Sequence, residues 1–223
     1  MTVHDVAPRL PAPAALRRLC RSLAMLDAIL CPDRNFRYHF FDAHRIPGQE
    51  AAWMSNGSGD EYAVLFSASG VCLLGFDHES PLTPYARNDL SVWPGVIDDV
   101  PETFRPFVES AKDEWGTPAV TACLWRETGD DAWRHGAVDV PTDVEDGAEY
   151  LFELLIDPTP DAFQRFAQDY YEVPVDLTAV AHVYASEPLT DHVMKSLNPR
   201  LALADLADDV HAIDYPCAAP GTD

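Results

Sequence analysis

Three adjacent ionisable residues, Asp77, His78 and Glu79, stand where an apolar stretch of the sequence ends, within GFDHESPLTPY. If they extend a β-strand, successive side chains alternate between faces, so Asp77 and Glu79 share one face and His78 takes the other. Two carboxylates on one face can hold a metal ion or serve as an acid–base pair. The candidate chemistry is hydrolysis at a carboxylate and histidine site, with or without a metal. A solvated strand end explains the same residues, and both interpretations stay open.

A second candidate cluster lies in LWRETGDDAWRHG, residues 124–136. Tryptophan and arginine are over-represented at binding hot spots, and acidic side chains suit a basic partner. The alternative is a β-hairpin with its tryptophans in the core and its charges at the tip. On the first interpretation, the residues predicted to bind a partner are Trp93, Trp125, Asp130, Asp131, Trp133 and His135.

Common catalytic and metal-binding motifs do not occur in the sequence. It contains no GxSxG, no GxGxxG after a strand, no P-loop and no HExxH. The cysteines are odd in number, widely spaced and never form CxxC, which argues against a disulfide framework and a zinc knuckle. We therefore expect no cofactor and assign no metal ligands. The five cysteines are Cys20, Cys31, Cys72, Cys123 and Cys217.

Acidic residues dominate the charge of the chain. There are 37 acidic and 15 basic residues among 223, for a formal net charge of -22. Residues 1–50 carry 7 basic and 5 acidic side chains, which leaves 8 basic and 32 acidic ones for residues 51–223. Such a surface repels nucleic-acid backbones and anionic membranes, and it attracts basic proteins in a salt-dependent way. Acidity that only keeps the protein soluble is the competing explanation.

The hydrophobic pattern predicts one helix, then a sheet, then further helices. Leucines recur three and four residues apart from Leu16 to Leu30, as on one face of a helix that begins at Pro13. Asn56-Gly57 and SASG (67–70) predict the tight turns of an antiparallel meander. A short helix is expected at 101–112, and capped helices follow Asp146. Strands are expected at 35–41, 50–56, 61–67, 71–76, 118–127 and 133–140.

These elements predict an α+β fold: a mostly antiparallel sheet of five to six strands, with an N-terminal helix and a C-terminal helical segment. Residues 1–12 are expected to be a loose leader, and 13–145 to form the helix and the sheet core. Residues 146–215 should be helices packed on the same domain, and 216–223 a loose tail. Free thiols and the lack of an export signal in the sequence predict a cytoplasmic protein.

The predicted function is that of a non-catalytic, acidic binding protein. It would capture or neutralise a basic protein partner, as a toxin-neutralising immunity protein does, and would bind neither nucleic acid nor membrane. The alternative is a hydrolase-type enzyme, with or without metal assistance, that uses Asp77, His78 and Glu79.

Overall fold

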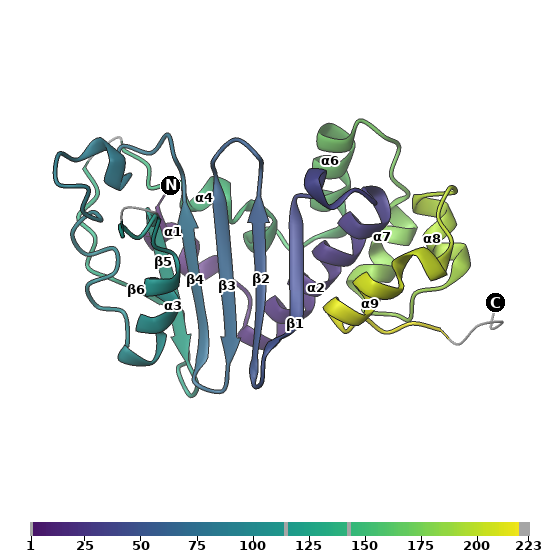
Figure 1. Cartoon of the computed structure of the whole chain (residues 1–223), viewed down its shortest axis with the longest axis horizontal. Coiled ribbons are helices and arrows are strands. Elements are labelled where there is room, and N and C mark those ends of the chain that lie inside the picture. Colours follow the sequence, from purple (N-terminus) through teal and green to yellow (C-terminus); the bar gives the residue numbers. More distant parts are fainter. Residues whose placement is uncertain (1, 114–115, 142–143, 219–223) are drawn as a thin grey trace.

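One antiparallel sheet organises the molecule, and the predicted α+β fold is confirmed. The computed structural model describes residues 2–113, 116–141 and 144–218. Within these residues the strands lie in sequence order, and each pairs with the next (Figure 1). The strands are β1 (His39–Ile46), β2 (Gln49–Ser55), β3 (Glu61–Ser67), β4 (Gly70–Phe76), β5 (Ala122–Glu127) and β6 (Arg134–His135).

Helices flank this sheet and extend beyond its β1 edge, where the C-terminal part of the chain gathers (Figure 1). Helix α7 packs against α2, and α9 packs against both α2 and β1. The helices are α1 (Val3–Val6), α2 (Pro13–Leu30), α3 (Arg105–Ser110), α4 (Ala148–Leu151), α5 (Glu153–Ile156), α6 (Pro160–Tyr171), α7 (Leu177–Tyr184), α8 (Asp191–Leu197) and α9 (Ala207–Ile213). None in the described ranges is long and apolar enough to cross a bilayer.

The core lies between α2 and the sheet. Leu16, Leu23 and Leu26 of the predicted leucine stripe are fully buried. Strand β4 is buried on both faces, as its unbroken apolar sequence predicts, with Cys72 and Leu73 fully enclosed. The β3–β4 turn requires glycine, because Gly70 has a φ of +133° and a Cβ there would lie 2.2 Å from the carbonyl oxygen of Arg126.

The expected loose leader is instead ordered and docked. Residues 3–9 form α1 and a 3-10 turn, and Val3 and Val6 are buried. The backbone N–H of Val3 donates to Asp146 Oδ2 at 2.7 Å. Two physical effects hold this segment in place. Burial of the two valine side chains stabilises the contact with the rest of the domain, and the Asp146 carboxylate accepts a hydrogen bond from a backbone N–H at the start of the helix.

The structure also differs at two later segments. The strand expected at 133–140 is only the two-residue β6. It ends before Gly136, which lies so close to the Gly95 backbone that a Cβ on Gly136 would lie 1.8 Å from the Gly95 carbonyl oxygen. At the expected loose tail, the backbone N–H of Leu189 donates to the Pro216 carbonyl at 2.9 Å. The described end of the chain, up to residue 218, is therefore attached by hydrogen bonds, and residues 219–223 lie outside the described residues.

Candidate functional site

The chain turns sharply where Asp77, His78 and Glu79 follow β4. Asp77 Oδ1 accepts hydrogen bonds from the backbone N–H groups of Glu79 at 2.9 Å and Ser80 at 3.1 Å. The backbone N–H of Asp77 donates to Thr121 Oγ1 at 3.1 Å. Because β4 ends at Phe76, the strand-like alternation considered from the sequence does not apply. A tight turn gathers these side chains at one end of the sheet.

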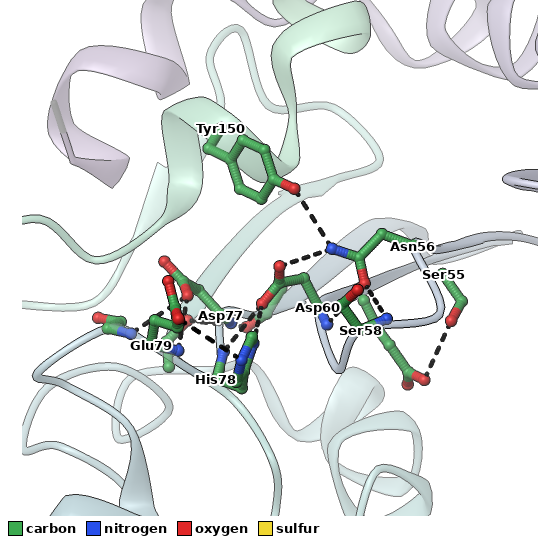
Figure 2. Close-up of polar contacts among 12 residues, drawn as sticks. Ser55, Asn56, Ser58, Asp60, Asp77, His78, Glu79 and Tyr150 are labelled. Atoms are coloured by element: carbon green, nitrogen blue, oxygen red, sulfur yellow. Dashed lines mark hydrogen bonds and ion pairs between the residues drawn. The ribbon is translucent and has the colours of Figure 1, made fainter. Parts of the chain in front are cut away.

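Asp60 joins this turn from the neighbouring strand. Glu61, the first residue of β3, pairs with Phe76, the last of β4, so the residues just outside each strand lie side by side. Asp60 Oδ1 accepts a hydrogen bond from the His78 backbone N–H at 3.1 Å and lies 2.6 Å from His78 Nδ1 (Figure 2). Asp60 is therefore the candidate residue that sequence reasoning missed, although it directly precedes β3 and follows the tight turn predicted from Asn56-Gly57.

Asp60 and His78 shift each other's pKa. The hydrogen bond to Asp60 raises the pKa of His78, and the nearby carboxylates add to this effect. Burial alone would raise the pKa of Asp60, but hydrogen bonds from His78 and Asn56 together lower it below its usual value. Asp60 is therefore a carboxylate at neutral pH, and His78 Nδ1 donates the hydrogen bond between them.

Several carboxylate side chains line a concave surface beside these residues. It encloses about 660 Å³, and none of its lining residues is a lysine or arginine. At its wall, Arg9 Nη1 lies 3.6 Å from Glu149 Oε1. We call this surface the acidic pocket. It is lined by Asp60, Asp77, Glu79, Glu145, Glu149 and Glu153, together with Ser80, Pro81, Gly147 and Tyr150.

The segment before and within α4 forms the far wall of the acidic pocket. Gly147 has a φ of +81°, and a Cβ on it would lie only 2.4 Å from the Asp77 Cβ. Asn56 Nδ2 donates to the Tyr150 hydroxyl at 3.3 Å and to Asp60 Oδ2 at 2.7 Å (Figure 2). Residues far apart in the sequence thus meet here, and Tyr150 remains 53% exposed beside the carboxylates.

The tryptophans of the hairpin cluster lie mainly inside the molecule. Trp125 and Trp133 are buried, and Trp133 Nε1 donates to the Pro11 carbonyl at 2.8 Å. Trp93 is half-buried, and its ring lies under the guanidinium of Arg87 at 5.6 Å. Two of the three predicted anchor rings are therefore unavailable to a partner unless the hairpin opens.

The polar residues of the hairpin are more accessible. Asp130 forms an ion pair with Arg134 at 2.9 Å, and Asp131 is exposed. The ring of His135 packs edge-on against His4, with 4.4 Å between the ring centroids. None of these residues lines the acidic pocket. Partner binding by the hairpin stays a prediction, and burial restricts it to the exposed groups.

Only one described group of histidine, cysteine and acidic side chains brings its ligand atoms close enough for a metal. The group is Asp60, Asp77 and His78, whose ligand atoms all lie within 4.8 Å of one another. Glu79 from the sequence-based prediction is not part of it, and its side chain is 85% exposed. The arrangement can bind a cation, or it can orient His78 for proton transfer.

Comparisons with protein-family models, with curated proteins and with solved structures find no match to this chain.

Proposed function

We propose that this protein captures a basic protein partner by binding one of its cationic side chains or segments in the acidic pocket. The main observation behind this proposal is that six carboxylates surround one cavity of about 660 Å³, with no lysine or arginine among the lining residues. A cavity of this size accommodates a lysine or arginine side chain and its neighbours. Its carboxylates supply acceptors for the several N–H donors of such a group.

Electrostatics supports capture over simple solubility. Like charges held close together raise each other's energy, and a bound cation relieves this repulsion. The negative surface of residues 51–223 would also steer a basic protein toward the molecule at low ionic strength. Tyr150 adds an exposed ring on which a guanidinium can stack.

The test is a pull-down from the native host, eluted with a salt gradient and identified by mass spectrometry. We expect one basic protein in stoichiometric amount, released as salt rises. The double variant Glu79→Gln with Glu153→Gln removes two pocket charges at exposed positions, and it should weaken capture at least tenfold.

A matched control removes the same charge elsewhere. Asp169→Asn with Asp208→Asn alters two exposed positions outside the pocket and should leave capture nearly unchanged. Equal losses in both double variants would mean that only net charge matters. A third variant, Trp93→Ala with Asp131→Asn, examines the other residues that the sequence predicted to bind a partner, and a loss confined to this variant would move the binding surface to them. Finding no basic partner at low salt would reject the proposal.

Hydrolysis remains a second candidate function, and one observation favours it. Asp60 holds the His78 imidazole in a fixed orientation, as the carboxylate does in a histidine-based catalytic group. The ring nitrogen on the other side, Nε2, lies 4.0 Å from Glu79 Oε1. Assays of the parent protein and of His78→Gln with ester, amide and phosphoester substrates distinguish hydrolysis from binding alone. If the protein is a hydrolase, the parent protein turns over one of these substrates and His78→Gln does not.

A further inference from the structure

We infer that Asp60, Asp77 and His78 form a binding site for one divalent first-row metal ion, and that this ion is Zn²⁺. The site lies where β3 begins and β4 ends, at the margin of the acidic pocket (Figure 2). Ion binding here does not depend on the proposed capture of a partner, and its ligand set has Asp60 in place of the Glu79 that the sequence suggested.

Geometry brings the three ligand groups nearly to coordination distance. Their ligand atoms lie within 4.8 Å of one another. Two atoms bound at about 2.1 Å to one tetrahedral zinc ion lie about 3.4 Å apart. The more distant ligand atoms must therefore approach by up to about 1.4 Å, while Asp60 Oδ1 and His78 Nδ1 separate from 2.6 Å, and side-chain rotation supplies both changes without moving the strands. Because Glu61 and Phe76 are paired in the sheet, the backbone that carries the ligands is held in place.

The kinds of ligand atom select the kind of ion. One imidazole nitrogen with two carboxylates suits Zn²⁺ and other first-row divalent ions, whereas Ca²⁺ and Mg²⁺ prefer oxygen ligands alone. Two carboxylates balance the charge of the ion. The remaining acids of the pocket lower the energy of a cation further, and water completes the coordination from the cavity side.

Neighbouring groups already orient the ligands. Asn56 Nδ2 donates to Asp60 Oδ2 at 2.7 Å, and two backbone N–H groups donate to Asp77 Oδ1. Asp77 Oδ2 is therefore the oxygen left to bind an ion, and a Cβ added to Gly147 would lie 2.6 Å from it. Metal-binding carboxylates and histidines usually have such supporting hydrogen bonds.

The hydrogen bond between Asp60 and His78 must be exchanged for bonds to the ion. Asp60 Oδ1 and His78 Nδ1 lie 2.6 Å apart, with one proton between them. Coordination through Nδ1 requires a neutral imidazole whose remaining proton is on Nε2. That nitrogen faces Glu79, 4.0 Å away, which can accept a hydrogen bond from it after a small rotation.

Calorimetric titration of the chelator-treated, metal-free protein with Zn²⁺ tests the site. We expect one ion per chain with a dissociation constant of about 10 µM or below, and no comparable binding of Ca²⁺. His78→Gln and Asp77→Asn should each weaken binding at least tenfold. The controls His192→Gln and Asp169→Asn change an exposed histidine and an exposed aspartate elsewhere, and should have no effect.

A second measurement locates the ion independently of affinity. The imidazole ¹⁵N resonances of His78 should shift on addition of one equivalent of Zn²⁺, while those of His192 stay unchanged. Circular dichroism and melting temperature establish that each variant is folded. Binding weaker than about 1 mM, or binding that His78→Gln leaves intact, identifies an adventitious ion only and overturns the site. Neither result would affect the pull-down, so the two proposals fail separately.

Discussion

At the scale of single residues, Gly147 is the position where the C-terminal helical segment packs closely against the Asp77 turn. The position needs glycine for two separate reasons: its φ of +81°, and the approach of Asp77, whose Cβ would lie 2.4 Å from an added Cβ. Gly48 has nearly the same φ, +79°, but no atom within 4 Å of an added Cβ. The chain thus contains a natural control that separates backbone strain from steric overlap.

We predict that Gly147→Ala destabilises the fold by about 3 kcal/mol, because the backbone must move away from Asp77. Gly48→Ala should cost about 1 kcal/mol, from the positive φ alone. Urea denaturation of both variants measures the difference. If the two substitutions cost the same, the close packing of Gly147 on Asp77 is absent in solution.

At the scale of elements, the strand order determines which loops meet. The sheet pairs β3 with β4, so the turn before β3 and the turn after β4 form one polar surface. Helix α4 closes this surface from a segment about 70 residues later in the chain. Asp146, just before α4, also secures α1, since its carboxylate accepts from the backbone N–H groups of Val3 and Ala148 at 2.7 and 2.9 Å.

We predict that Asp146→Ala destabilises the protein by about 2 kcal/mol, because two backbone N–H groups lose their acceptor in a buried place. Asp5→Ala removes an exposed hydrogen bond at the same short helix, to the backbone N–H of Thr2, and should cost less than about 0.5 kcal/mol. Equal unfolding midpoints in urea for the two variants would show that α1 is not anchored by Asp146.

At the scale of the whole molecule, tyrosine ionisation reports on packing. Seven of the eight tyrosines have a raised pKa, in each case with burial as the largest cause, and that of Tyr85 is raised to about 12. In an unfolded chain the same groups titrate near pH 10. A raised pKa means that the fold favours the protonated phenol. This stabilisation is complete below about pH 10 and is lost as pH rises through the raised values.

We therefore predict that most tyrosines ionise only when the protein unfolds in alkali. Absorbance at about 295 nm should show its steep change well above pH 10, coincident with loss of circular dichroism. In concentrated urea all eight should titrate together near pH 10. Ionisation of half of them near pH 10 with the structure intact would contradict the packing of the rings.

The sequence by itself determined the element types and the sheet. Leucine spacing, apolar runs and turn residues are local signals, so α2, the meander β2–β4 and the capped C-terminal helices could be predicted from neighbours in the chain. Net charge is also independent of fold, and it led to the prediction of a basic partner. The ordered leader was wrongly expected to be loose, because its partner Asp146 lies 143 residues away.

Only the tertiary structure decided which side chains meet. Asp77 and His78 could be selected from the sequence as polar residues at a strand end, but Asp60 and the wall around Tyr150 could not. Spatial neighbours from separate segments are set by strand register and helix packing, which depend on long-range burial. The same physics placed Trp125 and Trp133 in the core, since large apolar rings lower the free energy most where water is excluded.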